Sequence, residues 1–553
     1  ALLLVSLIAN ARKIKEALEG LDRKWLLLPA LVVLAFLISE VLLVKPTFWM
    51  YKDEYIEMSI GKVMIFNHEA GICSFNIGNY CMPDGIGLFQ QSDGWPLLFA
   101  IAFSIFGVSF ATAYNLTLLM SCISVLLVFF IIYLISKNKE ASLVGAIFLA
   151  FTPVFMTYSR STTLDVPAVT FVLLTLFASL VYLNNKKLAS GIMVASVAAF
   201  TMLMRIELGL FVPILLAFLF LPNLPSFNKK ELRNFVIALS LFLLLALPEF
   251  AFIYTSLTAN KFGAPNGRMF SFQYFKTSIK PDLLFWLGLY ANVYSGPYVY
   301  HDEYPIMYTL LGVIGALYLL RHKKSFAVAL ITYFLLVIIF FSSFYAGSIF
   351  GESGANLRYY LQDFAIMAIF AALGSIAIIE FISKRYKHLT KSNKKLILLI
   401  IVAAALLMPI VYINKIVMLP PSSLYPYAPD RAELSAVEQV VNKIPQNCIV
   451  LSYKPQLWYL LGKNSMFADW IFLPNYKNQA VNLSDNCIYF DYGTACLGAG
   501  PYPNGSMTRC NQIMQDFNMT PIIAEPYDKD GWNFTIGIYH INGYKNSTKL
   551  GST

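Results

Sequence analysis

Long apolar runs recur between residues 25 and 415, and each is about as long as a helix that crosses a lipid bilayer. The run at 188–221 is interrupted by Arg205 and Glu207, so it is either two short spans with an outer turn or one long helix. Counting two spans there, we expect about eleven transmembrane helices in a mainly α, polytopic membrane protein. They lie at 25–44, 111–135, 141–158, 165–183, 188–204, 207–221, 234–256, 304–320, 325–345, 360–382 and 396–415.

Basic residues cluster before the first span and after the second, fourth, sixth, eighth and tenth. Such clusters mark the cytoplasmic side of a membrane protein. The pattern predicts a cell-membrane protein with a cytoplasmic N-terminus and an extracellular C-terminal region. The apolar stretch 95–106 is too short to span, and counting it would move Lys137 outside. We interpret it as an interfacial helix on the outer leaflet.

Composition supports this assignment. The chain is 58% hydrophobic and 13% charged, whereas soluble domains contain about one quarter charged residues. The net charge of +10 does not indicate a nucleic-acid partner, because the basic residues form short clusters between apolar runs and not a stripe on a soluble face. Membrane lipids are the expected surroundings.

Two domains are expected. Residues 1–415 form the transmembrane domain, with 45–110 as its first outer loop. Residues 416–553 form an extracytoplasmic α/β domain, because strand-like runs at 448–453, 487–492, 520–524 and 535–541 alternate with helical patterns. No Gly-rich loop opens a helix there, so no nucleotide site is expected.

Cysteines and sequons agree with an outer location for this domain. Six of the seven cysteines fall in segments assigned to the outside: Cys73, Cys81, Cys448, Cys487, Cys496 and Cys510. An oxidising compartment permits disulfides among them, and the last four allow three pairings. N-glycosylation sequons occur at Asn482, Asn504, Asn518, Asn533 and Asn546. They favour a glycosylated archaeal or eukaryotic surface protein; the alternative is a polar, Asn-rich tail.

Carboxylates occur where outer segments meet spans. Asp53 and Glu54 follow the first span, and either could be a general base toward an acceptor hydroxyl. The alternative is a solvated charge pair. Asp165 closes an outer turn, where it is either functional or a helix N-terminal residue that complements the macrodipole.

Arginines accompany these carboxylates. Arg160, Arg205 and Arg358 fall on the predicted outer face, and arginine binds phosphate bidentately. For Arg205, the alternative is a structural ion pair with Glu207. Arginines and carboxylates on one face suggest a phosphate-bearing donor and a hydroxyl acceptor.

A divalent metal is a weaker expectation. His68 and Glu69 in the first loop and His301, Asp302 and Glu303 before the eighth span could together ligate one. No spacing rule connects the two groups.

Several motifs occur in a characteristic order: Asp53-Glu54-Tyr55, then Trp95-Pro-Leu-Leu, then Thr152-Pro153 with Tyr158, Arg160 and Asp165, and last Arg358-Tyr359-Tyr360. In this order the chain resembles the GT-C superfamily of lipid-linked-sugar glycosyltransferases. Within it, the chain is similar to the protein O-mannosyltransferase and lipid A aminoarabinose transferase group, as an archaeal-type member. It departs from the family where Gly94-Trp95-Pro96 replaces a double proline, and no tryptophan-rich oligosaccharyltransferase signature is found in the tail.

The resemblance implies inverting transfer of a hexosyl or pentosyl group from a polyprenyl or dolichyl phosphate donor. The acceptor would be a hydroxyl of a protein, glycolipid or glycan at the outer face. It implies that Asp53 is the base or the acceptor-orienting carboxylate and that Arg358 contacts the donor phosphate. The alternatives are a transporter or flippase of lipid-linked glycan, and a multi-span anchor for a surface domain.

Overall fold

The computed structural model divides the chain into two compact units. The first, here called the helical unit, comprises Ala1–Trp49, Gln90–Trp95 and Tyr114–Met418. The second, the sheet unit, comprises Met50–Phe89, Pro96–Ala113 and Leu419–Thr553. Within them the structure describes residues 2–44, 46, 51–83, 92–258, 270–287, 306–345, 347, 355–386, 390–418, 428–475, 487–497, 504–529 and 532–545.

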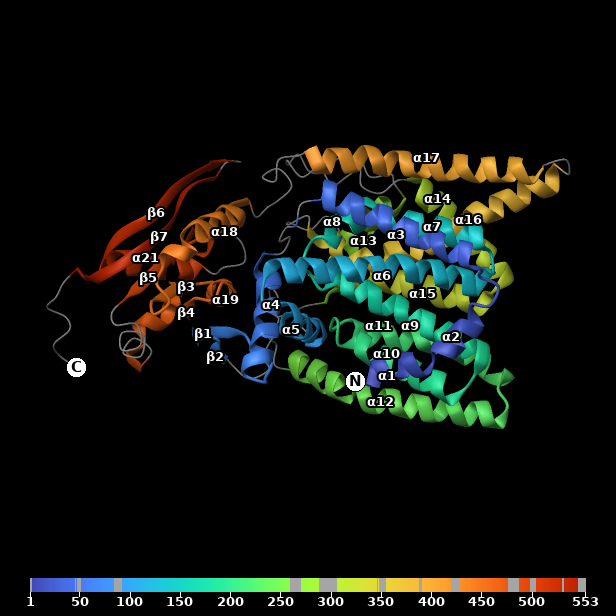
Figure 1. Ribbon diagram of the computed structural model, residues 1–553, viewed down its shortest axis with the longest axis horizontal. Helices are drawn as coiled ribbons and strands as arrows, with labels where there is room; N and C mark the ends of the chain where they lie inside the picture. Colours follow the sequence, from blue (N-terminus) through green and yellow to red (C-terminus); the bar gives the residue numbers. More distant parts are fainter. Residues whose placement is uncertain are drawn as a thin grey trace. The chain divides into compact units, whose positions relative to one another are not determined.

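The helical unit is built from α-helices that follow the apolar runs (Figure 1). In chain order they are α1 (Leu2–Ala9), α2 (Ala11–Ala17), α3 (Arg23–Leu43), α6 (Phe110–Ser136), α7 (Lys139–Ala150), α8 (Pro153–Ser159), α9 (Asp165–Asn185), α10 (Leu188–Met202), α11 (Leu208–Phe220), α12 (Lys229–Thr258), α13 (Phe272–Trp286), α14 (Ile306–His322), α15 (Lys324–Ser343), α16 (Leu361–Arg385) and α17 (Lys391–Met418). Short 3₁₀ turns, η1 (Leu221–Ser226) and η3 (Ala355–Tyr360), adjoin α11 and α16.

The multi-span character is confirmed. Among the described residues, seven helices are long and apolar enough to cross a membrane, and the pair α7 and α8, bent by 63°, would be an eighth. The helices α10 and α14 are apolar but shorter. The number of about eleven spans therefore remains a prediction. The helices α1, α2 and α13 fall outside the predicted spans.

The break at 203–207 decides between the two interpretations of the run at 188–221. The structure ends α10 at Met202 and begins α11 at Leu208, so Arg205 and Glu207 lie in the turn between two separate helices. The predicted helix at 95–106 is α5 (Gly94–Phe106), which has 13 residues. This length is too short for a span.

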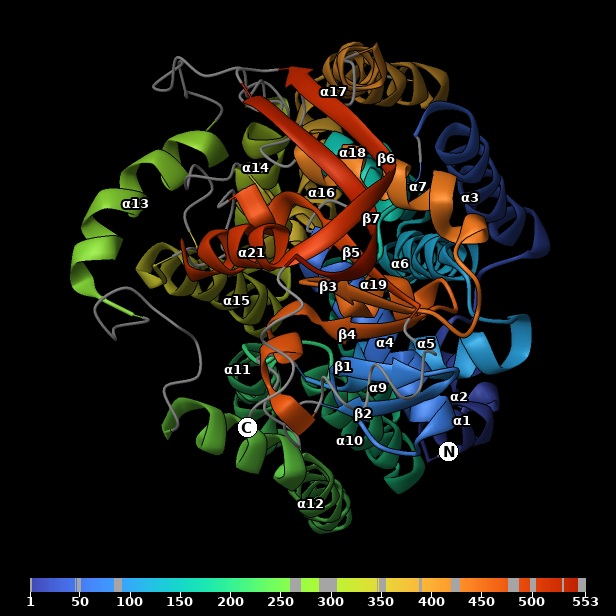
Figure 2. The ribbon, with the colours of Figure 1, turned by 90° about the vertical axis from the view of Figure 1, so that its left-hand side faces the viewer.

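Small residues permit close helix packing in the helical unit. A Cβ atom added to Gly374 of α16 would meet backbone atoms of Leu311 in α14, and one added to Gly315 would meet backbone of Phe370. Figure 2 shows α14 and α16 adjacent. Without Cβ atoms the two backbones approach closely, which is how membrane helices associate.

A seven-stranded mixed sheet, in the order β2-β1-β4-β3-β5-β7-β6, forms the centre of the sheet unit. Its parallel part is β3 paired with β4 and with β5, and the other pairs are antiparallel. The strands are β1 (Cys73–Ile77), β2 (Tyr80–Pro83), β3 (Ile449–Ser452), β4 (Asn464–Phe467), β5 (Ile488–Tyr492), β6 (Phe517–Lys529) and β7 (Trp532–Tyr544). All four strand-like runs predicted in the tail are found in strands.

Helices accompany this sheet in the sheet unit (Figure 1). They are α4 (Tyr51–Phe66), most of α5, α18 (Ala428–Val440), α19 (Pro455–Leu460) and α21 (Asn504–Asp516), with the 3₁₀ turns η5 (Val441–Lys443), η6 (Ala468–Phe472) and η7 (Thr494–Leu497). Buried Phe75, Leu451 and Phe490 contribute to one apolar core with Ile513 of α21.

The structure differs from the expected domain boundaries in one respect. The sequence analysis placed the first outer loop with the transmembrane domain. In the structure its hairpin β1–β2 extends the C-terminal sheet, because Phe75 of β1 pairs with Met466 of β4. Asn76 strengthens this junction: the Ser465 hydroxyl donates to its Oδ1 at 2.6 Å, and its own amide donates to the Lys463 carbonyl at 2.9 Å. Pairing between segments so far apart in sequence is invisible to periodicity.

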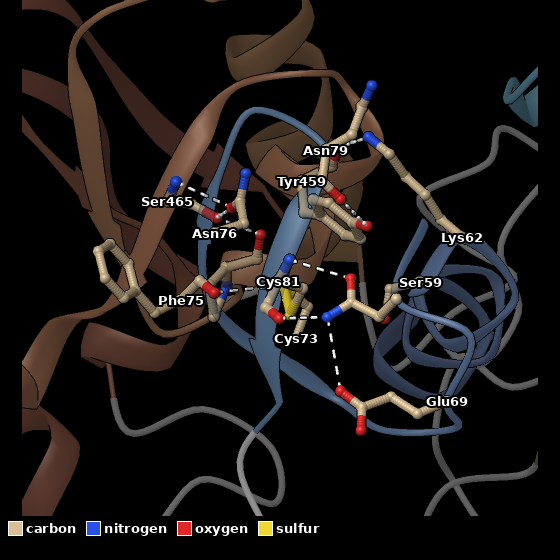
Figure 3. Close-up of a disulfide and its surroundings, with 12 residues drawn as sticks. Ser59, Lys62, Glu69, Cys73, Phe75, Asn76, Asn79, Cys81, Tyr459 and Ser465 are labelled. Carbon is tan, nitrogen blue, oxygen red and sulfur yellow. Dashed lines mark hydrogen bonds between the residues drawn. A yellow bond between two sulfur atoms is a disulfide. The ribbon is translucent and has the colours of Figure 1, made fainter. Parts of the chain in front are cut away.

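Three disulfides form in the sheet unit: Cys73–Cys81, Cys448–Cys487 and Cys496–Cys510. The first closes the β1–β2 hairpin beside α4 (Figure 3). The other two are one of the three pairings open to the C-terminal cysteines. Cys122 is buried and free in α6, as expected for a packing residue.

Candidate functional site

A buried ionic cluster lies where α9 begins and α10 gives way to α11. The guanidinium of Arg205 donates to Asp165 Oδ1 at 2.5 Å and forms a second ion pair with Glu207. All three side chains are less than one tenth exposed. We call Asp165, Arg205 and Glu207 the helical-unit cluster.

The contacts in this cluster test the structural roles that the sequence left open for Arg205 and Asp165. Arg205 is paired with Glu207, as a structural ion pair requires, and also with Asp165. Asp165 is the first residue of α9, where a carboxylate complements the helix dipole. Its Oδ2, however, is buried and has no hydrogen-bond partner among the described residues. Leaving such an oxygen unpaired costs free energy, so a structural role alone does not account for it.

Arg358 and Arg205 face the same aromatic ring. The Cζ atoms of Arg205 and Arg358 lie 5.1 and 4.9 Å from the ring centroid of Tyr359. Arg358 also donates to the Tyr359 hydroxyl at 3.2 Å. The tyrosine ring in turn stacks on Phe341 of α15, with centroids 4.8 Å apart. These cation–π contacts hold two guanidinium groups in one buried region.

The segment 92–95 connects two of the predicted outer turns. Trp95 is fully buried, and its indole nitrogen donates to the Thr162 carbonyl at 2.8 Å, in the turn that contains Arg160. The Gly94 amide donates to the Leu203 carbonyl at 2.7 Å, in the turn that contains Arg205. A Cβ at position 94 would collide with the Leu203 backbone. Glycine is therefore required at this position.

Arg160 faces a carboxylate that sequence reasoning missed. It is half-buried at the C-terminus of α8, and it interacts electrostatically with Glu40 of α3. Glu40 is fully buried, and neither of its carboxylate oxygens has a hydrogen-bond partner in the described part of the chain. An acid in such a place is rare and commonly functional.

Further buried acids lie in the helical unit. Asp363 in the first turn of α16 is fully buried, and neither of its oxygens has a hydrogen-bond partner among the described residues. Next to it, Gln362 accepts a hydrogen bond from Tyr333, while its own amide nitrogen has no partner within the described ranges. In α12, Glu249 accepts from Ser92 at 2.6 Å. The sequence could have indicated Glu40, Glu249 and Asp363 as functional candidates, because each is an acidic residue inside a predicted apolar span.

Asp53 and Glu54 lie in the first turn of α4, within the sheet unit. Asp53 is partly buried, whereas Glu54 is completely buried. Tyr55, the third residue of this motif, is also completely buried. The burial of Glu54 does not match a solvated charge pair, and the residue has a structural or functional role in α4.

The metal-site candidates are only partly described. His68 has a left-handed backbone with φ of 62°, and Glu69 accepts a hydrogen bond from Asn67 at 3.5 Å. His301, Asp302 and Glu303 lie outside the described residues. Over the part of the chain that the structure describes, no group of three or more His, Cys, Asp or Glu side chains could hold a metal ion. The divalent metal stays a prediction.

The structure describes three of the five sequon asparagines. Asn518 is exposed in β6, Asn504 begins α21 and Asn533 lies in β7. Asn482 and Asn546 fall outside the described residues. Glycosylation at the five sites stays a prediction.

Comparisons with known proteins include the part of the chain that contains this cluster. Residues 94–252, which include both turns of the cluster, match the sequence profile of the family described as dolichyl-phosphate-mannose-protein mannosyltransferase. A sequence comparison with curated proteins finds no significant match.

Solved structures resemble nearly the whole chain. ArnT from Cupriavidus metallidurans in the apo state is 11% identical, with a TM-score of 0.56 over 94% of this chain and 98% of that one. Its complex with undecaprenyl phosphate gives 11% identity and a TM-score of 0.51 over the same shares. The archaeal oligosaccharyltransferase AglB from Archaeoglobus fulgidus, in complex with an inhibitory peptide and a dolichol-phosphate, is 12% identical with a TM-score of 0.51 over 93% of this chain and 74% of that one. The family match over residues 94–252 supports the resemblance to the GT-C superfamily, and the solved structures show that the chain shares their fold over most of its length.

Proposed function

We propose that the chain is a membrane glycosyltransferase that moves a sugar from a polyprenyl or dolichyl phosphate to an acceptor hydroxyl. Support comes from the family match, whose description names a dolichyl-phosphate-sugar enzyme. It also comes from structural neighbours captured with undecaprenyl phosphate and with dolichol-phosphate. Both ligands are polyprenyl phosphates, so a carrier lipid of this class is the expected donor or its product.

One observation carries the proposal: the helical unit buries two arginines around Tyr359 among carboxylates whose oxygens are incompletely hydrogen-bonded. A protein that needed only stability would satisfy these groups internally. In the part of the chain that the structure describes, Asp165 Oδ2 and both oxygens of Asp363 have no hydrogen-bond partner, and they can accept hydrogen bonds from sugar hydroxyls. The guanidinium groups can stabilise a phosphate.

The two arginines receive different roles. Arg205 is already neutralised by Asp165 and Glu207, so we assign it to positioning: it fixes the Tyr359 ring and the turn between α10 and α11. Arg358 is assigned the phosphate contact, because its Cζ lies 4.9 Å from the Tyr359 ring centroid in the same region as Arg205 and its guanidinium remains charged at any physiological pH.

Asp53 is the proposed base. It removes the proton from the acceptor hydroxyl as the oxygen attacks the anomeric carbon of the sugar. The bond between that carbon and the phosphate oxygen breaks, and the polyprenyl phosphate leaves with the electron pair. A phosphate leaving group requires charge stabilisation more than a proton. A single displacement inverts the anomeric centre.

We infer that the sheet unit lies outside the cytoplasm and the N-terminus inside. All three disulfides are found in the sheet unit, and disulfides persist in oxidising compartments. A membrane-impermeant protease applied to intact cells should cleave the C-terminal region and leave the N-terminus intact. Cleavage of the N-terminus alone would show that the orientation is the opposite of the one inferred here.

The function is tested with the purified full chain, a panel of radiolabelled polyprenyl-phosphate hexoses and pentoses, and protein and glycan acceptors. We expect transfer by the wild type and a loss of about 100-fold or more in kcat for Asp53→Asn, the range for a general base. Asp516→Asn, at an exposed carboxylate of the same unit, is the matched control and should retain activity. Full transfer by a folded Asp53→Asn variant would remove the assigned role. Movement of the carrier across vesicles without any covalent product would favour a transporter.

A further inference from the structure

A cavity of about 430 Å³ lies inside the sheet unit, between α4, α5 and α19. Met58, Lys62 and Phe66 contribute to it from one face of α4, four residues apart. Phe103 and Phe110 line another side, and Leu461 closes the end of α19. The proposed transfer chemistry uses none of these residues.

Lys62 is the unusual member of this lining. It is 3% exposed, and its ammonium donates to the Tyr459 carbonyl at 2.6 Å and lies 4.0 Å from the centroid of the Tyr459 ring (Figure 3). An ammonium has three N–H donors, and this one pairs with no carboxylate among the described residues. Buried charges are normally paired, so the structure provides a cation without its anion at the wall of a cavity.

The exposed residues near the cavity indicate which kind of molecule supplies an anion for Lys62. The helix α5 exposes an apolar stripe, Leu97, Ile101, Ile105 and Phe106, which are 40–76% exposed. Phe66 at the cavity is also 41% exposed. A short helix with such a face lies in the membrane interface. Lipids are therefore the molecules that meet this part of the surface.

We propose that this cavity binds an anionic membrane lipid, with the phosphate at Lys62 and one apolar chain against Phe66, Phe103 and Phe110. With about 30 Å³ for each water-sized group, 430 Å³ accommodates part of one chain and not a complete polyprenol. Burial lowers the pKa of Lys62 to about 8, so the side chain is still mostly a cation near neutral pH. The site is independent of the proposed transfer reaction and goes beyond it.

The test uses the full chain in phosphatidylcholine nanodiscs with two photoactivatable probes, a diazirine-acyl phosphatidylglycerol and the matching phosphatidylcholine. Peptide mapping should find labelling of residues 58–66 and 103–110 that is about tenfold stronger with the anionic probe, the size of one charge-assisted contact. Lys62→Gln should abolish this preference. Lys443→Gln, at an exposed lysine of the same unit, should not change it.

A second variant covers the case in which Lys62→Gln does not fold. Leu461→Trp fills the cavity and should remove labelling by both probes. Equal labelling by both lipids in the wild type, or labelling that Leu461→Trp leaves unchanged, would identify ordinary annular lipid and overturn the proposal. Displacement of the anionic probe by millimolar inorganic phosphate would assign the cavity to a soluble anion instead. Asp53→Asn does not enter these outcomes, so a failed transferase assignment would not affect them.

Discussion

Each unit of the molecule contains a buried ionic cluster, and the two clusters differ in how completely they are hydrogen-bonded. In the sheet unit, Glu433 Oε2 accepts from Lys454 Nζ at 2.6 Å, from the Thr494 amide at 2.9 Å and from the Thr494 hydroxyl at 2.7 Å. Lys454 donates to the Thr494 hydroxyl oxygen as well. We call Glu433, Lys454 and Thr494 the sheet-unit cluster. Each of these three side chains is hydrogen-bonded to the other two.

The helical-unit cluster, by contrast, remains open. In the described part of the chain, Asp165 uses one oxygen on Arg205 and leaves the other without a hydrogen bond, and Asp363, a buried acid of the same unit outside the cluster, leaves both oxygens without one. Since an unsatisfied buried acceptor costs about 1–3 kcal/mol, the open arrangement destabilises the protein unless a ligand completes it. The comparison therefore distinguishes a cluster that maintains a fold from one prepared to bind.

The largest effect is expected when the closed cluster loses its cation. Lys454→Met leaves Glu433 buried and unpaired, which should lower the free energy of unfolding by about 3–5 kcal/mol. Hydrogen exchange of β3 and β5 in the purified chain measures this loss. The double variant Lys454→Met with Glu433→Leu should recover most of it. A single variant as protected as the wild type would show that the cluster does not stabilise the sheet unit.

A smaller effect, on activity and not on stability, is expected for the incompletely hydrogen-bonded acids of the helical unit. Asp363→Asn replaces a buried carboxyl group by an amide of the same shape, so thermal stability should stay close to that of the wild type, while transfer activity falls by about tenfold, the loss of about 1.4 kcal/mol of transition-state binding. Steady-state kinetics and a thermal melt separate the two. Glu433→Gln in the closed cluster is the matched control and should lower stability. If Asp363→Asn lowered stability and left kcat/KM intact, the distinction between the clusters would fail.

A further effect concerns pH, through Asp491 of β5, which lies beside the sheet-unit cluster. Burial, with the negative charge of Glu433 as the second cause, raises the pKa of Asp491 to about 7. Its Oδ2 accepts from Ser452 at 2.8 Å and from Trp458 at 2.9 Å. The folded state thus holds a proton that the unfolded state releases near its ordinary pKa of about 4. Stability should fall as pH rises from about 4 to 7 and level off above.

Hydrogen exchange of β5, corrected for the intrinsic pH dependence of exchange, measures this trend. Asp491→Asn keeps an oxygen acceptor for Ser452 and Trp458 and should flatten the profile. An unchanged slope in that variant would assign the pH dependence to another group.

Several parts of the candidate site could be predicted from the sequence. The sequence places Asp165 in an outer turn and Arg205 and Arg358 on the predicted outer face, and the structure gathers Asp165 with Arg205, and Arg205 with Arg358 around one tyrosine. Glu40 and Asp363 are acidic residues as well but were hidden within runs that already scored as spans. The partners of Arg205 could not be predicted, because Asp165 lies 40 positions away.

The sequence by itself determined most of the apolar helices and four of the strands of the tail, because hydrophobic length and periodicity are local properties of the chain. Only the tertiary structure decided that the first outer loop supplies two strands to the C-terminal sheet, which cysteines pair and which buried charges are satisfied. Each of these depends on contacts between distant segments. Such contacts form only when the whole chain has packed, so no local pattern records them.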